Sequence, residues 1–285
     1  MFKQTIAGVA VACVVAGQAW AGVSYTSVTK SEGGRGSDAQ NMTVKALVEG
    51  TNAKMEFTQS GNPMMKAGSY ILTKDAGGTM YMVNPSEKNY MKWDMEAMMK
   101  MAKGMMNMMT FSNIKVEKVS EAPGESILGY PTTHYKFRTS YNVDMNMMGM
   151  KNSTAIVREE DIWATTKFKD AGLNAWGKAF QSKTNNEQLD KLIQESKKKM
   201  DGFPLKMVSN DTTTDARGTV HTTKTTMEVT ELKSTSVPAS AFEIPAGYAE
   251  EKMDMPGDTS GGGKGGDNEM PAAAQEMMKA LQGKK

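Results

Sequence analysis

The feature that most constrains this fold is an alternation of apolar and polar residues with a period of two, repeated along much of the chain. It is clearest in the segments 41–50, 53–60 and 134–141. In the last of these, one face carries Tyr135, Phe137 and Tyr141, and the other carries His134, Lys136 and Arg138. Such alternation is typical of β-strands with one buried and one solvated face, which is the pattern of antiparallel sheets.

Turn residues separate several short strands and predict hairpins. Asp75-Ala76-Gly77-Gly78 divides "SYILTK" from "TMYMVN", and Pro85-Ser86-Glu87-Lys88 precedes "NYMKWD". Further strands are expected near 114–119, 155–164, 205–209 and 220–232. Three segments have helical spacing instead: 95–109, "LNAWGKAF" at 173–180, and "NNEQLDKLIQESKKK" at 185–199. Strands dominate and no βαβ rhythm appears, so we predict an α+β fold with a large antiparallel sheet and inserted helices.

The first 21 residues have the pattern of a secretory signal peptide. Lys3 precedes an apolar run, and the run ends on Ala19-Trp20-Ala21, an A-x-A-like cleavage site. We therefore predict cleavage after Ala21 and an exported, periplasmic protein. No later apolar run reaches the roughly 20 residues of a membrane-spanning helix, so we expect no integral membrane segment in the mature chain.

Composition narrows the possible chemistry. The only cysteine, Cys13, lies inside the predicted signal peptide, so the mature chain would have no disulfide and no thiolate. The formal net charge is +2, and it falls to +1 when Lys3 is removed. A nucleic-acid partner usually requires a basic surface, so we expect none.

The chain after Tyr248 changes character. Residues 249–269 are polar and rich in glycine, which predicts a flexible linker after the domain at 22–248. Residues 270–285 are rich in methionine and alanine and predict a short terminal helix, which needs a surface to dock on for stability.

Methionine is concentrated in "MEAMMKMAKGMMNMM", where eight of fifteen residues are methionine. Wound as a helix, the segment places all eight on one half of its surface: Met95, Met98, Met99, Met101, Met105, Met106, Met108 and Met109. Gly104 is the weak point, because glycine inside a helix costs about 1 kcal/mol relative to alanine. The face either packs on the sheet alone or also contacts an apolar ligand, since methionine adapts to variable shapes.

Two other uses of methionine remain open. Thioethers are soft ligands for Cu(I), and "MNMMGM" brings together Met145, Met147, Met148 and Met150, with Asp144 as a possible oxygen ligand. Met253 and Met255 have similar spacing. Alternatively, exposed methionines of the tail, such as Met277 and Met278, could scavenge oxidants.

We find no catalytic constellation in the sequence. His134 and His221 lie in alternating strands and are interpreted as ordinary surface histidines. Glu159 and Asp161 could share a strand face beside Trp163, which we interpret as a solvated edge rather than an acid/base pair. "GGGKGG" lacks the preceding strand and the subsequent Ser/Thr of a phosphate-binding loop. We therefore expect no enzymatic activity and no cofactor, apart from the Cu(I) of the alternative interpretation.

Several short motifs together resemble a known family. They are "YMVNPSEKNY", "ILGYPTTHYKF", Trp163 in "IWAT", Gly202-Phe203-Pro204-Leu205, and "FEIPAGY" ending at Tyr248. Their order resembles an exported bacterial family of unknown function, DUF4412, which is in turn similar to the LolA/LolB-type lipoprotein carriers. The resemblance implies a half-open antiparallel barrel with helices on its concave face and a cavity for acyl chains.

The favoured interpretation is thus a non-enzymatic periplasmic carrier. Its ligand would be an acyl chain, a lipid or a lipidated protein, held between the methionine-lined helix at 95–109 and the half-barrel. Cu(I) binding is the alternative.

Overall fold

The computed structural model describes residues 22–34, 37–93, 109–147, 150–168, 187–197 and 200–251. Within these ranges, twelve strands form one sheet in the order β12-β6-β5-β4-β3-β2-β1-β11-β10-β9-β8-β7. Every neighbouring pair is antiparallel except β12 and β6, which run parallel. The ends of the sheet are not joined to each other in this order, so the sheet is open.

The strands fall into two runs along the chain. The first run is β1 (Gly22–Glu32), β2 (Met42–Glu49), β3 (Asn52–Ser60), β4 (Tyr70–Lys74), β5 (Thr79–Asn84) and β6 (Asn89–Trp93). The second run is β7 (Met109–Pro123), β8 (Thr133–Met147), β9 (Met150–Thr165), β10 (Phe203–Thr214) and β11 (Val220–Thr235), after which β12 (Ala249–Glu251) returns to β6. We call β1–β6 with β12 the first half of the sheet, and β7–β11 the second half. The two halves meet where β1 pairs with β11.

The predicted α+β class is wrong, because the described chain is almost entirely β. Its single described α-helix is α3 (Glu187–Lys197), accompanied by the 3-10 turns η1 (Ser37–Gln40), η2 (Asp75–Gly77), η3 (Thr166–Phe168) and η4 (Ala239–Phe242). The physical cause is the length of the strands. Strand β10, for example, spans Phe203–Thr214 although the apolar pattern predicted a strand only near 205–209, because the hydrogen bonds of a sheet join backbone groups and do not require apolar side chains. The predicted helix at 185–199 corresponds to α3, whereas the one at 173–180 lies outside the described residues.

The predicted strands and their two faces are confirmed. Val44, Ala46 and Val48 of β2 are buried, while Lys45 between them is exposed. The predicted hairpins at 75–78 and 85–88 join β4 to β5 and β5 to β6. The strands predicted near 114–119, 155–164, 205–209 and 220–232 lie within β7, β9, β10 and β11. Alternation alone was therefore sufficient to locate most of the sheet.

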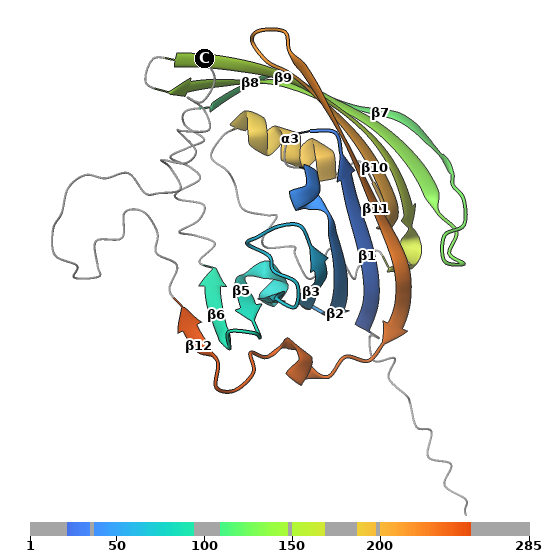
Figure 1. Cartoon of the computed structure of the whole chain (residues 1–285). Helices are drawn as coiled ribbons and strands as arrows, with labels where there is room; N and C mark the ends of the chain where they lie inside the picture. The colour runs from blue at the N-terminus through green and yellow to red at the C-terminus, as the bar shows by residue number, and fades with distance from the viewer. Residues whose placement is uncertain are drawn as a thin grey trace, which may run out of the picture.

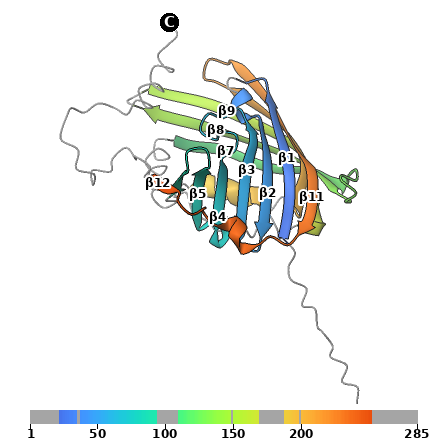
Figure 2. The ribbon, with the colours of Figure 1, turned by 60° about the horizontal axis from the view of Figure 1, so that its bottom comes forward.

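The sheet is strongly curved, and α3 lies on its concave side (Figures 1 and 2). The second half arches over α3 in Figure 1, with the first half below it. Leu192 of α3 is buried and faces β8 and β9. The curvature therefore gives the molecule an inner face, which we call the concave face, and an outer face.

The outer face of the first half is covered by the chain between β11 and β12. This segment crosses the bottom of the first half in Figure 2. Its Val237 and Phe242 form a core with Tyr70, Leu72 and Val83. The backbone N–H of Val237 donates to Glu49 Oε2 at 2.9 Å, which fixes the start of the segment. Strand β4 consequently has buried residues on both faces.

The segment ends in β12, whose Ala249, Glu250 and Glu251 pair with Asn89, Tyr90 and Met91 of β6. These residues lie at the start of the stretch that the sequence predicts as a linker. Tyr90 Oη donates to Glu250 Oε2 at 3.2 Å, and Asn89 Nδ2 donates to Glu251 Oε1. The edge of the first half is thus held by side chains as well as by the backbone.

Candidate functional site in the concave face

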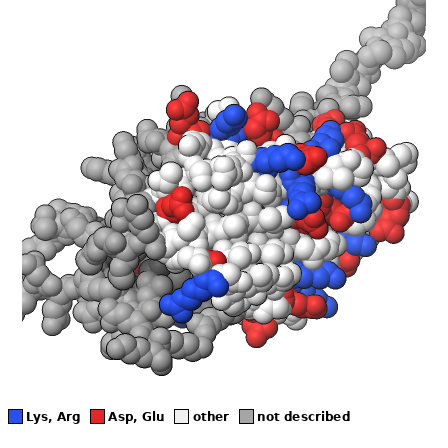
Figure 3. All heavy atoms as spheres, turned by 90° about the horizontal axis from the view of Figure 1, so that it is seen from above, with Lys and Arg blue, Asp and Glu red and all other residues white. Residues whose placement is uncertain are grey.

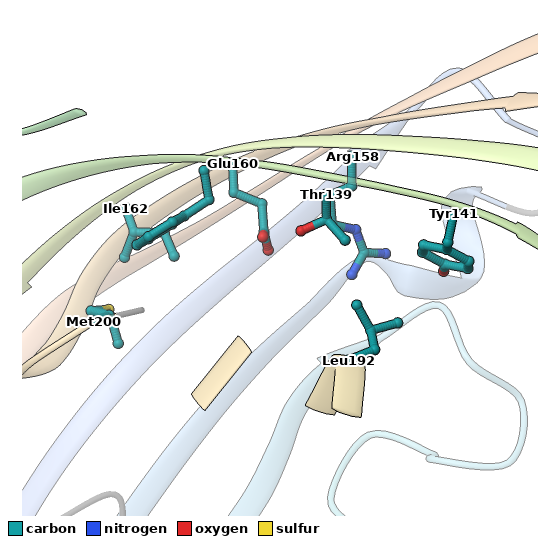
Figure 4. Close-up of a pocket in the computed structure, with 8 residues that line it drawn as sticks. Thr139, Tyr141, Arg158, Glu160, Ile162, Leu192 and Met200 are labelled. Atoms are coloured by element: carbon teal, nitrogen blue, oxygen red, sulfur yellow. The ribbon is translucent and has the colours of Figure 1, made fainter. Parts of the chain in front are cut away.

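A cavity of about 240 Å³ opens in the concave face of the second half. Its walls come from β8, β9, α3 and the approach to β10, as Figure 4 shows. The lining residues are Phe137, Thr139, Tyr141, Arg158, Glu160, Ile162, Leu192 and Met200. Five of these eight side chains are apolar or aromatic, so the cavity combines a hydrophobic lining with a small number of polar groups.

The period-two alternation of β8 and β9 builds the wall of this cavity. Thr139 is paired with Arg158, and Phe137 with Glu160, so each pair shares one face of the sheet. Leu192, which is buried, approaches from the opposite side of the cavity, from α3. A one-residue slip between β8 and β9 would move this set to the outer face.

The polar part of the cavity is organised around Arg158. Its Nε donates to Asp211 Oδ1 on the neighbouring strand β10. Asp211 also accepts a hydrogen bond from the buried Ser209 hydroxyl at 3.1 Å. Burial acts to lower the pKa of Arg158, but the hydrogen bond and charge of Asp211, with Glu160 and Tyr141 adding to it, raise that pKa overall. The guanidinium is therefore charged and held in place.

The polar residues lie in the middle of the cavity, between apolar or aromatic residues. In Figure 4, Ile162 and Met200 lie at one end, Glu160, Thr139 and Arg158 in the middle, and Leu192 and Tyr141 at the other end. A mainly apolar ligand with a polar group along its length matches this arrangement. The volume is below the roughly 300–1,000 Å³ of most small-molecule pockets, so it suits one part of such a ligand.

Methionines from several strands gather on the same concave face. Across neighbouring strands, Ile162 pairs with Met207, Met207 with Met227, Met227 with Thr29, and Thr29 with Met42. Residues paired in this way share a face of the sheet. Met42 in turn packs against the cluster of Val44, Phe57, Ile71 and Met80. The register and packing place on this face, among others, six methionines that we call the concave-face methionines: Met42, Met55, Met80, Met82, Met207 and Met227. Sequence reasoning missed them because they are scattered singly, one or two to a strand.

The predicted ligand-binding methionines have mixed outcomes. Seven of them, Met95, Met98, Met99, Met101, Met105, Met106 and Met108, lie outside the described residues. Met109 is described, and it is the first residue of β7 rather than the end of a helix. It is paired with Met145 of β8. The physical reason is the strand alternation that begins at Met109 and buries Phe111 on β7.

The predicted Cu(I) residues lie at the hairpin between β8 and β9. Met145 is half-buried beside Met109. Met147 is paired in register with Met150 across the hairpin. Met148 lies outside the described residues. Met109 is thus a sulfur-bearing neighbour that the sequence prediction did not include in this group.

The outer face of the second half carries a different cluster. His134 stacks on Trp163, with ring centroids 4.2 Å apart, and its Nε2 lies 2.7 Å from Asp161 Oδ1. Lys136 Nζ also approaches Asp161 Oδ1, at 3.2 Å. His134 is therefore a half-buried, paired residue rather than an ordinary surface histidine. His221 of β11 is exposed.

Glu159 and Asp161 do share this outer face, as the sequence predicts, but only Glu159 is an exposed residue. Seen from above in Figure 3, basic and acidic side chains are interspersed over the second half. Lys206 illustrates the mixing, because its Nζ lies 3.2 Å from Glu125 Oε1 and 4.9 Å from the ring of Trp163. Among the described residues, this face has no extended patch of a single charge sign that would attract an oppositely charged partner.

Within the described ranges, no group of three or more His, Cys, Asp or Glu residues is arranged to hold a metal ion. The same part of the chain includes no helix with the length and apolarity to cross a membrane.

Comparison with known proteins identifies a family and no activity. A family model described as "Domain of unknown function (DUF4412)" matches residues 35–248. No curated protein matches the chain. A solved structure described as that of PNGF-II is similar over 82% of this chain and 32% of its own, at 9% identity and a TM-score of 0.33. A likeness that low carries no argument about fold or function.

Proposed function

Because the chain belongs to the DUF4412 family, whose name assigns no activity, we propose a function from the site itself: binding of an apolar ligand on the concave face. The observation that supports it is the gathering of concave-face methionines next to a cavity lined by Phe137, Ile162 and Leu192. Methionine side chains are flexible and polarizable, so they suit a surface that accepts ligands of variable shape.

We propose that the ligand is an acyl chain, a lipid or the lipid of a lipidated protein, and that the protein carries it without catalysis in the periplasm. The compartment follows from the predicted signal peptide at 1–21. The cavity is large enough for part of such a chain, and the concave-face methionines offer a continuation. The resemblance to LolA/LolB-type carriers points the same way and stays a prediction.

The uncharged fluorophore N-phenylnaphthylamine tests this proposal, because its emission rises in apolar surroundings. We expect Ile162→Asn to weaken binding of the dye about tenfold, since roughly 1.5 kcal/mol of apolar contact is lost. Val157→Asn is the matched control: Val157 is on the same strand, is equally half-buried, and points to the outer face. Failure of the full chain to bind the dye, or equal losses in both variants, would refute the proposal.

The second candidate is Cu(I) binding at the β8–β9 hairpin. The observation that favours it is the direct pairing of Met109 with Met145, next to the paired positions Met147 and Met150. Thioether sulfurs select Cu(I) over harder ions. A Cu(I) competition titration should show weaker binding for Met109→Leu and for Met145→Leu. Unchanged affinity in both, and in the variant with Met145, Met147, Met148 and Met150 all replaced by Leu, would remove this candidate.

A further inference from the structure

One row of side chains crosses the concave face from the cavity to the first half of the sheet. It begins at Ile162 of β9, and the residues paired with one another on the next four strands continue it: Met207, Met227, Thr29 and Met42. All five side chains are half-buried, and all except Thr29 are apolar. We call these five residues the cross-strand row. It forms an apolar path that runs across the strands rather than along them.

The rows on either side of this path have a different character. On one side the next row is polar and contains Ser209, Thr225 and Ser31. Ser31 Oγ lies 3.1 Å from Thr225 Oγ1, so these hydroxyls are bonded to each other. On the other side the next row is buried and contains Leu205, Val229 and Val44. Successive residues on one face of a strand are about 7 Å apart, so the path has the width of one hydrocarbon chain.

The two ends of the cross-strand row also differ. Beyond Ile162, the paired residue on β8 is Tyr135, which is buried in a cluster that includes Met200. Beyond Met42, the paired residue on β3 is Ser60, whose hydroxyl accepts a hydrogen bond from the backbone N–H of Asn62 at 3.0 Å. A chain that starts at the cavity is therefore blocked on the β8 side, and on the other side its apolar contacts end at Met42.

The row consequently has a defined length. Neighbouring strands lie about 4.8 Å apart, so the four spacings from β9 to β2 span about 19 Å. Carbon–carbon bonds of about 1.5 Å with angles of about 111° advance an extended hydrocarbon chain by about 1.25 Å per carbon. The cross-strand row therefore matches an extended chain of about 15 carbons.

We propose that the cross-strand row binds one extended acyl chain of about 15 carbons, which leaves the cavity at Ile162 and ends at Met42. The ligand class is then a single-chain amphiphile with a long acyl chain. The inference rests on the proposed function, because it concerns the same apolar ligand on the same face. It adds the number, the direction and the length of the chain.

A series of lysophosphatidylcholines tests the length, because its members share one head group and differ only in the acyl chain. Microscale thermophoresis of the full chain measures the Kd of each ligand, kept below its micelle concentration. From the decanoyl through the lauroyl and myristoyl to the palmitoyl ligand, we expect the affinity to rise about two- to fourfold per added carbon. The stearoyl ligand should bind no more tightly than the palmitoyl ligand, because its last carbons pass the end of the row.

Matched variants test the position of the chain. Met42→Asn should shorten the row by one strand spacing, so that it matches about 12 carbons. The affinity for the palmitoyl ligand should then fall about tenfold, whereas the affinity for the decanoyl ligand should not change. Met55→Asn is the control: Met55 is also half-buried and packs on the same cluster as Met42, but lies outside the row. It should leave the ratio of the two affinities unchanged, and binding of the decanoyl ligand shows that each variant is folded.

The outcomes separate the inference from the function on which it rests. If N-phenylnaphthylamine binds but no lysophosphatidylcholine does, or if the affinity does not depend on chain length, the inference is wrong and apolar binding stands. An affinity that continues to rise to the stearoyl ligand, or equal losses in Met42→Asn and Met55→Asn, would also overturn it. If neither the dye nor any of these ligands binds, the proposed function and the inference fail together.

Discussion

The two halves of the sheet solve the problem of burial in different ways. In the first half, both faces are covered: Ala46, Ala53 and Phe57 are buried on the concave face, and Leu72 and Val83 on the outer one. In the second half, the outer face of β8 and β9 is solvated and charged. The first half therefore contributes mainly to stability, whereas the second half supplies the wall of the candidate site.

The difference comes from one segment. Residues 237–248 cover the outer face of the first half only. Strands such as β4 are therefore buried on both faces instead of having one solvated face. The second half keeps the clean alternation expected of an antiparallel sheet with one solvated face. Stability and ligand binding should consequently respond to different sets of substitutions.

Weakening the packing of residues 237–248 on the first half should have the largest effect on stability. Phe242→Ala should lower the free energy of unfolding by about 3–5 kcal/mol, because Phe242 is only 2% exposed and fills the space over Tyr70 and Leu72. Urea denaturation followed by far-UV circular dichroism measures this. Ser240→Ala, in the exposed part of the same turn, is the control. A loss below about 1 kcal/mol would mean that the segment does not stabilise the first half.

Tyr70, on the covered outer face of the first half, should also make the free energy of unfolding depend on pH in the alkaline range. The pKa of Tyr70 is raised to about 12, mainly by burial and to a smaller extent by Tyr248 and Glu56. The pKa of a tyrosine in an unfolded chain is about 10. The folded state thus retains the Tyr70 proton to higher pH than the unfolded state does. The contribution of this protonated side chain to stability is complete below about pH 10 and is lost as the pH rises toward about 12. The loss should be about 2 kcal/mol. The loss is isolated by measuring the free energy of unfolding of the native chain and of Tyr70→Phe at about pH 9 and about pH 11.5. A difference between the two proteins that is the same at both pH values would argue against a raised pKa of Tyr70.

On the outer face of the second half, the cluster around Asp161 should contribute less. Asp161→Asn removes the ion pair with Lys136 and weakens the contact with His134, which should cost about 1 kcal/mol. Glu159→Gln, whose carboxylate lies 3.9 Å from Arg138 on the exposed surface, should cost less than about 0.5 kcal/mol. Thermal unfolding of the two variants compares them, and a reversed order would contradict the half-buried role given to His134 and Asp161.

A small effect of the opposite sign is expected at Thr73 of β4, in the first half. Its side chain is fully buried, and its hydroxyl has no hydrogen-bond partner among the described atoms. Thr73→Val keeps the shape and removes the unsatisfied group, so stability should rise by up to about 1 kcal/mol. A decrease measured by urea denaturation would show that the hydroxyl does have a partner.

The sequence was most informative where local pattern and tertiary pairing agree. Period two located the strands and placed Phe137 and Tyr141 opposite His134 and Lys136, as observed. It could not reveal which strands are buried on both faces, because that depends on the segment at 237–248, which is far from β4 in the chain. The fold class was wrong because strands such as β10 extend well beyond the apolar runs that predict them.

The candidate site was less predictable than the fold. A dense run of methionines drew attention to 95–109, yet the described concave-face methionines are single residues on separate strands that only the register brings together. Met109 shows the limit most clearly, because a helical projection cannot distinguish a last helical turn from the first residue of β7. Arg158, Glu160 and Asp211 gave no sequence signal, since charged residues in strands usually lie on the solvated face.

The most direct test of apolar binding on the concave face is photocrosslinking in the native compartment. A benzophenone amino acid replaces Tyr141, an aromatic residue of the cavity, or Lys136, which lies on the outer face of the same strand. After irradiation, mass spectrometry of the recovered protein should show lipid or lipoprotein adducts in the Tyr141 variant and none in the Lys136 variant. Adducts in both variants to the same extent, or in neither, would contradict the account.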